Sequence, residues 1–238
     1  MAGVSLSSVV SDAQLPDLLL APRYTMSEAA RYVGVPVSTF ATWAKGYERR
    51  PVGRSVVKQG PVITSVPRGR LRVPFIGLAE STVLAAFRRR HKMPLQRIRP
   101  AVRVLEEQIG LHHALASERL FTDGAEILYD FAERRGEDEI SDLVVLRSGQ
   151  HVFHQVIKDY LERITYDEEG WAARIILPIT AHRVFEVDPR RGAGRPLFVH
   201  GGAPLANIVG RLKAGDSAAE VARDFAVPLE DLLEATAA

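Results

Sequence analysis

The first strong pattern of apolar and polar positions lies near the start of the chain, at residues 24–43. Thr25 and Glu28 have the T-x-x-E spacing of a capping box, in which both side chains accept hydrogen bonds from orphan backbone N–H groups at the start of a helix. Gly34 permits the turn that follows, and Pro36 is expected to begin the next helix, where its missing N–H costs nothing. The pattern predicts a helix-turn-helix; an ordinary helical hairpin is the plainer alternative.

The second helix of this pair is predicted to have one buried and one outward face. Phe40 and Trp43 fall on the buried face at helical spacing. The outward side chains are short and polar, which suits a nucleic-acid groove. Three of them are predicted to contact bases: Ser38, Thr39 and Thr42.

After the helix-turn-helix, two segments alternate between apolar and polar residues and are predicted to be strands. Residues 62–66 and 71–75 are joined by a Pro-Arg-Gly-Arg turn, so a hairpin with Arg68 and Arg70 at its tip would form a wing. The helices expected beyond the wing are residues 80–90 and one or two more within residues 94–109.

The middle of the chain mixes the two periodicities, which predicts a mixed α/β region at residues 120–188. Helical spacing at residues 156–164 includes Ile164 as its last apolar position. The strands expected in this region are residues 125–129, 143–146 and 172–177. A loop rich in Gly, Arg and Pro at residues 189–196 is expected to precede a final helical module.

That final module repeats the first pattern. Ser217 and Glu220 form a second capping box, and residues 217–232 match residues 25–40 position by position, with Leu232 at the place of Phe40. The residues predicted to face outward from its second helix are acidic: Glu230, Asp231 and Glu234. Phosphate would repel them, so this copy is predicted to contact protein and not nucleic acid.

The chain is therefore predicted to be an α+β protein in four parts. They are an N-terminal arm at residues 1–23, a winged helix-turn-helix domain at 24–119, the mixed α/β middle region at 120–188, and a C-terminal helix-turn-helix-like module at 189–238.

The distribution of charge indicates that the two ends of the chain bind different partners. The net charge is only +2, yet residues 45–103 hold fifteen Lys and Arg against two acids, Glu48 and Glu80. Such clustering behind a helix-turn-helix favours a polyanion-binding face over a merely solvated Arg-rich surface. The side chains predicted to hold phosphates are Lys45, Arg49, Arg50, Arg54, Arg68 and Arg70.

The sequence gives little support to catalysis or metal binding. The absence of cysteine excludes disulfides and thiolate zinc sites. His151 and His154 lack a third ligand at metal-site spacing, and the adjacent pair His112 and His113 would point apart on a helix. Glu126, Asp130 and Glu133 have helical spacing that is more typical of a solvated face. We expect no enzyme, no cofactor and no metal, and, since no apolar run approaches a membrane span, a cytoplasmic protein.

Particular residues at both ends resemble known families. Asp188-Pro189, residues 194–198, Ala203-Pro204-Leu205 and residues 212–217 resemble a small bacterial family, long catalogued as a domain of unknown function, whose members are found as VapB-type antitoxins beside PIN-domain toxins. Tyr24, residues 29–35 and Trp43 resemble the MerR-like winged helix-turn-helix. The order of the two also resembles a mycobacterial VapB-type antitoxin. Pro36 departs from the polar cap usual in the MerR-like helix, and the missing cysteines argue against metal sensing.

The resemblance implies an antitoxin of a type II toxin–antitoxin system, which sequesters a PIN-domain ribonuclease toxin and binds operator DNA to repress its own operon. A homodimer is expected, because one winged helix-turn-helix offers a small interface; the apolar faces of residues 83–87 and 102–109 are the candidate contacts. The residues expected to bind the toxin are Leu229, Leu232, Leu233, Glu230 and Asp231.

Two other functions remain compatible with the sequence. One is a ligand-sensing winged helix-turn-helix regulator with DNA as its only partner, and the other is a metal-dependent nuclease that uses the acidic middle region. A PIN-domain reading frame directly downstream would favour the antitoxin over the regulator, whereas divalent-ion-dependent cleavage would favour the nuclease.

Overall fold

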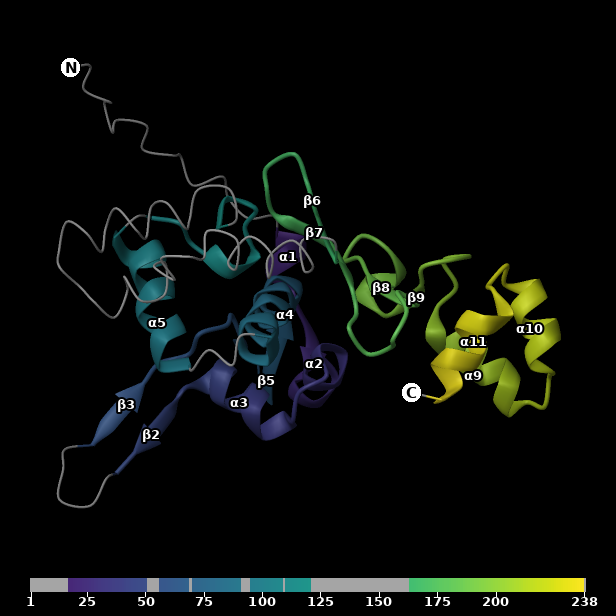
Figure 1. Ribbon diagram of the computed structural model, residues 1–238, viewed down its shortest axis with the longest axis horizontal. Helices are drawn as coiled ribbons and strands as arrows, with labels where there is room; N and C mark the ends of the chain where they lie inside the picture. Colours follow the sequence, from purple (N-terminus) through teal and green to yellow (C-terminus); the bar gives the residue numbers. More distant parts are fainter. Residues whose placement is uncertain are drawn as a thin grey trace.

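The computed structural model describes residues 17–50, 56–68, 70–90, 95–108, 110–120 and 163–237. Figure 1 shows an elongated molecule. The N-terminal domain lies at one end, three helices (α9 to α11) lie at the other, and a small sheet (β6 to β9) lies between them.

The N-terminal domain begins with α1 (Asp17–Leu20), β1 (Pro22–Thr25), α2 (Met26–Val33) and α3 (Val37–Lys45). Two hairpins follow, formed by β2 (Tyr47–Arg49) with β3 (Val57–Gln59) and by β4 (Val66–Arg68) with β5 (Arg70–Pro74). The domain continues with α4 (Phe75–Arg90), α5 (Leu95–Arg103), the π-helical turn η1 (Val104–Gln108) and the 3₁₀ turn η2 (Ala114–Ala116).

The predicted helix-turn-helix is present as α2 and α3. The Glu28 backbone N–H donates to Thr25 Oγ1 at 3.1 Å, and the Thr25 backbone N–H donates to Glu28 Oε2 at 2.8 Å, which completes the capping box. Gly34 ends α2 in the left-handed conformation, with φ of 70°. The start of α3 differs by one residue from the prediction: Pro36 lies before the first helical residue, and its carbonyl accepts the Phe40 N–H.

The hairpin predicted to form a wing is present as β4–β5, and it belongs to a larger sheet with the order β1-β5-β4. The first strand expected there began at residue 62, whereas β4 begins at Val66. Val62 is held elsewhere, because its N–H donates to the Trp43 carbonyl at 2.8 Å and so caps the end of α3. Strand β1 carries no pattern of its own and owes its conformation to pairing with β5.

Helix α4 is the centre of the N-terminal domain and is buried on every side from Phe75 to Phe87. The apolar faces of residues 83–87 and 102–105 are part of this core. They are therefore not available as the dimer contacts expected from the sequence, because an apolar face that is already packed within its own chain offers no surface to a second copy.

The middle sheet is antiparallel with the order β6 (Ile164–Tyr166), β7 (Ala172–Ile176), β8 (Phe185–Val187) and β9 (Leu197–Phe198). The strand predicted at residues 172–177 is confirmed by β7. The helical assignment of Ile164 is wrong, since this residue pairs with Ile175 in the sheet. The strands predicted at residues 125–129 and 143–146, and the rest of the helix predicted at 156–164, lie outside the described residues except for Arg163.

The C-terminal helices are α9 (Leu205–Lys213), α10 (Ala218–Asp224) and α11 (Leu229–Ala237). They pack on the same continuous core as β8 and β9. The loop at residues 189–196 contains the short turn η4 (Gly192–Gly194) and connects two neighbouring strands of one sheet. Among the described residues, no helix combines the length and the apolar character needed to cross a membrane.

Candidate nucleic-acid and partner-binding surfaces

The outward face of α3 contains the three residues predicted to read bases. Ser38 is exposed, and Thr39 and Thr42 are half-buried. The Thr42 hydroxyl donates to the Ser38 carbonyl at 3.0 Å, which leaves its oxygen lone pairs free to accept a hydrogen bond. Lys45 is exposed at the end of this helix. The structure thus brings all four predicted residues onto the same helix, beside the exposed Val37.

The β2–β3 hairpin follows α3 after a single residue, and it was not predicted. Its strands are three residues each and show no clean alternation, so the sequence carries little signal for them. Arg50 and Lys58 are exposed and both contact Glu48, at 2.8 and 3.7 Å. Arg49 lies in β2, whereas Arg54 lies outside the described residues. Two of the six predicted phosphate ligands, Arg49 and Arg50, therefore lie in the described part of this hairpin.

The β4–β5 hairpin places the other two arginines together. Arg68 and Arg70 are paired residues at the end of the two strands, as expected for the tip of a wing. Their backbone position agrees with the prediction.

A polar cluster surrounds the buried Glu80 of α4. The backbone N–H and the hydroxyl of Thr64 both donate to the carboxylate of Glu80, and His113 Nδ1 lies 2.9 Å from Glu80 Oε1. Burial and the nearby Glu80 carboxylate raise the pKa of Glu106 to about 7. Since Glu80 is buried, Glu48 is the only acid that residues 45–103 present to solvent in the described part of the chain.

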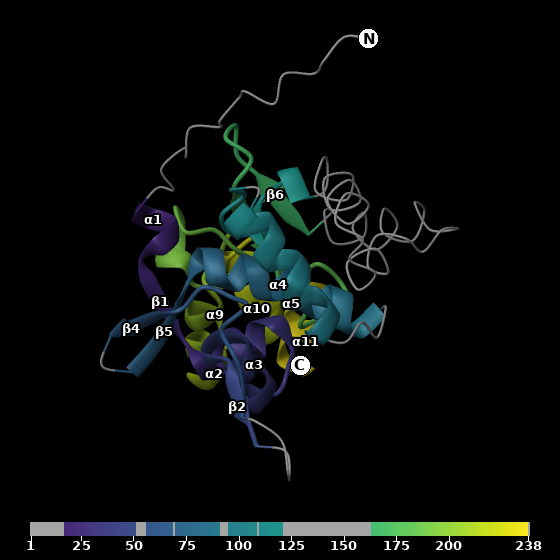
Figure 2. The same cartoon turned by 90° about the vertical axis from the view of Figure 1, so that its left-hand side faces the viewer.

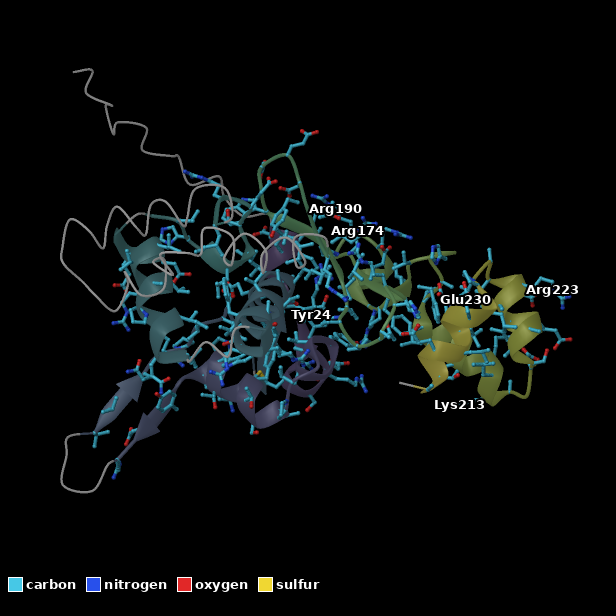
Figure 3. All side chains as sticks on the ribbon, viewed as in Figure 1. Tyr24, Arg174, Arg190, Lys213, Arg223 and Glu230 are labelled. Carbon is cyan, nitrogen blue, oxygen red and sulfur yellow. The ribbon has the colours of Figure 1, made fainter. Side chains whose placement is uncertain are left out.

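The start of the N-terminal domain contacts the η4 turn and the residue after it through polar groups. The buried Tyr24 hydroxyl donates to the Gly194 carbonyl at 2.8 Å, and the Arg23 guanidinium donates to the Ala193 carbonyl at 3.1 Å. Arg195 contacts Glu28 of the capping box at 3.3 Å. Burial raises the pKa of Tyr24 well above its ordinary value, so this hydroxyl stays a donor. Figure 3 shows Tyr24 on the side of the N-terminal domain that faces the middle sheet.

The C-terminal pair α10 and α11 repeats the backbone of α2 and α3. The capping box is complete, with the Glu220 N–H donating to Ser217 Oγ at 3.3 Å. In the turn, the Val227 N–H donates to the Ala222 carbonyl at 2.9 Å, as the Val35 N–H does to Ala30. The predicted internal repeat is therefore present as three-dimensional structure. Ala226 occupies the place of Gly34 and has φ of 52°, which an alanine rarely adopts.

The outward face of α11 differs from the prediction at two of the five proposed toxin-binding residues. Leu232 is 0% exposed because it fills the core position of Phe40, and Asp231 is 9% exposed because it bonds to His200 Nδ1 at 2.8 Å. Neither side chain lies on the surface. Leu229 and Leu233 are 43% and 53% exposed, one turn apart, and Glu230 lies beside them.

An open groove adjoins Leu229. It has a volume of about 790 Å³ and is lined by apolar side chains of α10 and the following turn, including Ala222 and Val227, together with His200 and Arg223. The next acidic residue along α11, Glu234, bonds to His182 Nδ1 at 2.6 Å. This hydrogen bond raises the pKa of His182, and bonds from the backbone and ring of His182 lower the pKa of Glu234. Glu230 therefore lies beside the apolar ridge of Leu229 and Leu233, and Glu234 follows one turn later with His182 as its partner.

Metal and catalytic candidates are few. The described residues contain no group of three or more His, Asp or Glu side chains arranged to hold a metal ion. His112 and His113 lie in a turn, where His113 has φ of 52°. Glu126, Asp130, Glu133, His151 and His154 lie outside the described residues.

Comparison with known proteins also separates the N-terminal part of the chain from the C-terminal part. Residues 22–102 match the family described as "Putative DNA-binding HTH domain", and residues 186–237 match "Protein of unknown function (DUF433)". The Mycobacterium tuberculosis protein named "Putative antitoxin VapB45" is 46% identical over 228 residues, which are 91% of this chain and 95% of that protein. A second protein of that organism, "Uncharacterized protein Rv2308", is 26% identical over 230 residues, 94% of this chain and 93% of its own. A crystal structure of Rv2018 from Mycobacterium tuberculosis has a TM-score of 0.74 and 42% identity, covering 92% of this chain and 98% of that one.

Proposed function

The chain belongs to the family of the protein named "Putative antitoxin VapB45", and from this premise we propose that it is the antitoxin of a type II toxin–antitoxin system. Its N-terminal domain binds operator DNA and represses its own operon, and its C-terminal module binds a PIN-domain ribonuclease of the VapC type. It acts by binding and not by catalysis. The observation that carries this proposal is the presence of two helix-turn-helix pairs with one backbone design and opposite outward charge.

The DNA half of the proposal rests on α3 and the two hairpins. Ser38, Thr39 and Thr42 face outward from a helix that is short enough and polar enough to enter the major groove. The cations at the end of α3 and on the hairpins would neutralise phosphates on either side. The three-stranded sheet β1-β5-β4 beside the helix pair supports a MerR-like winged arrangement for this domain.

The toxin half rests on α11 and the groove beside it. Leu229 and Leu233 form an exposed apolar ridge that a protein partner would bury, and Glu230 adds a negative charge beside it. A ribonuclease needs a basic surface to hold RNA, so an apolar ridge with a negative charge beside it is complementary to it. The toxin-binding set that we propose is therefore Leu229, Glu230 and Leu233.

The test is co-expression of this chain with the product of the neighbouring gene, followed by affinity capture. We expect the wild type to capture a PIN-domain protein and to restore growth of cells that express it. Leu229→Glu combined with Leu233→Glu should lose both, while binding to DNA from the upstream region stays unchanged. A chain that binds this DNA but captures no protein would instead be a regulator without a toxin.

We also propose that the active species is a homodimer that reads two half-sites, as helix-turn-helix proteins commonly do. The contact surface must differ from the buried faces of α4 and α5. Light scattering of the chain with and without the upstream duplex tests this proposal, and a monomer under both conditions would contradict it.

A further inference from the structure

We propose that the two strands of the β2–β3 hairpin and the described residues beside them, 47–50 and 56–60, form a DNA-gripping element that contacts backbone phosphates beyond the bases faced by α3. This inference rests on the proposed DNA-binding function and adds to it a second element, with Lys58 as a phosphate ligand and Arg99 as the residue that positions the hairpin.

The first observation is where the hairpin starts. Gly46 connects α3 directly to β2, with φ of 75°. A Cβ atom at this position would overlap the Gln59 carbonyl oxygen, at 2.0 Å, so only glycine allows the two strands to close immediately after the helix. The hairpin is therefore fixed to the end of the helix that is proposed to enter the groove. Figures 1 and 2 both show it extending away from the rest of the domain.

The second observation is that the base of the hairpin is anchored by a buried cation. Arg99 of α5 is only 9% exposed, and its guanidinium lies over the Tyr47 ring, 5.5 Å from the centroid. One of its nitrogens donates to the Gly60 carbonyl. Tyr47 begins the first strand and Gly60 follows the second, so a single side chain holds both ends of the hairpin. Burial lowers the pKa of Arg99, because removing the guanidinium from water is unfavourable for its charged form. The Tyr47 ring and the Gly60 carbonyl offset part of this desolvation cost.

The third observation is charge. The side chains of Arg50 and Lys58 are 79% and 78% exposed. Residues 47–60 contain four cations and one acid, Glu48, which contacts both of these side chains. Exposed ion pairs contribute little to stability, so phosphates could replace Glu48 at small cost. A polyanion beside the end of α3 is the partner that this surface fits.

The reach of the hairpin follows from strand geometry. A strand rises about 3.4 Å per residue, so each three-residue strand spans roughly 10 Å. One DNA strand carries a phosphate every 3.4 Å along the axis. Laid along the DNA axis, the described part of the hairpin would extend the contact by about three base pairs.

The main experiment measures the affinity of the full chain for two duplexes as a function of salt. One duplex carries the region upstream of this chain's own reading frame, and the other is a scrambled sequence of the same length. Arg50→Ala with Lys58→Ala should weaken binding to both duplexes by about tenfold or more at about 0.1 M salt, and should reduce the slope of log affinity against log salt by up to about two units. Glu48→Gln should have the opposite effect and tighten binding to both, which a hairpin with only a structural role would not produce.

The matched control replaces two exposed cations elsewhere, Arg190 and Lys213, with alanine. Figure 3 shows them beside the middle sheet and on the C-terminal helices, away from the hairpin. This control should change neither the affinity nor the slope. An equal loss in the control and in the hairpin variant would overturn the proposal, because the effect would then be one of net charge.

The role of Arg99 is tested by hydroxyl-radical footprinting. Arg99→Met removes the guanidinium from the base of the hairpin without removing a surface cation, and the protected region should shrink by about three base pairs while its centre stays protected. Arg99→Lys should restore part of the flank. If Arg99→Met fails to fold, Tyr47→Leu serves instead, because it removes the ring that Arg99 contacts while changing a less buried residue. The protected region should shrink in the same way.

The outcomes separate this inference from the proposed function. A wild-type chain that binds neither duplex refutes the DNA half of the proposed function itself. Wild-type binding with an unchanged slope and footprint in the hairpin variants refutes the hairpin alone. Loss of a dimer in the hairpin variants, detected by light scattering, would show that the hairpin pairs with a second copy and would also overturn the proposal.

Discussion

The helix pairs α2–α3 and α10–α11 share a backbone and differ in almost every side chain that faces outward. Both have a complete capping box, a residue with positive φ in the turn, and a large apolar side chain fully buried in the second helix. Outward, α3 presents Ser38 and Lys45 where α11 presents Glu230 and Ala237. The comparison shows that a few inward positions specify this fold, while the outward positions are free to select a polyanion or a protein.

The largest effect is expected at the equivalent core positions Phe40 and Leu232. Both are 0% exposed, so truncation leaves a cavity that costs about 3–5 kcal/mol for Phe40→Ala and about 2–5 kcal/mol for Leu232→Ala. We expect the first to abolish DNA binding and the second to abolish toxin capture. Hydrogen exchange followed by region measures this: Phe40→Ala should release protection in α2 and α3, and Leu232→Ala in α10 and α11. Equal loss in both regions would show that the two pairs are one cooperative unit.

Substitutions at the two turn residues, Gly34 and Ala226, are expected to change the stability of the fold in opposite directions. Gly34→Ala should destabilise by roughly 1–2 kcal/mol, because φ of 70° is unfavourable for alanine and the new Cβ would lie 2.9 Å from an Arg89 nitrogen. Ala226→Gly should stabilise by up to about 1 kcal/mol, since it relieves the same conformation. Chemical denaturation of both variants checks the pair. A loss of stability in Ala226→Gly would mean that the turn is held by contacts of the alanine methyl group.

The capping residues should behave alike in the two pairs. Thr25→Ala and Ser217→Ala each remove one acceptor for a backbone N–H, which costs about 1 kcal/mol. Denaturation midpoints of the two single variants and the double variant measure this, with additive losses expected for distant sites. A much larger loss for Thr25→Ala would point to Arg195, which contacts the capping box of the first pair but not of the second.

The smallest effect is a pH dependence restricted to α11. His182 bonds to Glu234, whose counterpart in α3 is the neutral Thr42. The pKa of His182 is raised, so its contribution is fully present below the ordinary value of 6.5 and is lost as the pH rises through the raised value. The pKa of Glu234 is lowered, so its contribution is present above 4.5 and is lost as the pH falls through the lowered value. The midpoint of thermal unfolding should therefore differ most between wild type and His182→Gln in mildly acidic buffer, and the difference should vanish in alkaline buffer. A constant difference across this range would contradict the ion pair.

Sequence patterns identified the parts of this fold that are specified locally. The two capping boxes, the buried Phe40, the β4–β5 hairpin and β7 all follow from residues close together in the chain. Strand β1 carried no such signal, because its conformation depends on pairing with the remote strand β5. The β2–β3 hairpin carried none either, because its strands are too short to show an alternation of apolar and polar residues. The burial of Asp231 could not be predicted from a helical repeat either, since its partner His200 lies on a separate loop. Arg99 likewise belonged to a run of cations and acquired its role only when α5 packed beside Tyr47 and Gly60.

The hydrogen bond between Tyr24 and Gly194 has a consequence for how the protein is made. Its two partners are 170 residues apart in sequence. At the usual pace of about 5–20 residues per second, a ribosome needs roughly 10–30 s to add the stretch between them. Until the η4 turn has been made and has left the exit tunnel, the Tyr24 hydroxyl of the nascent helix-turn-helix lacks this acceptor. The portion proposed to bind DNA therefore completes its own packing only once the ribosome has begun the portion proposed to bind the toxin.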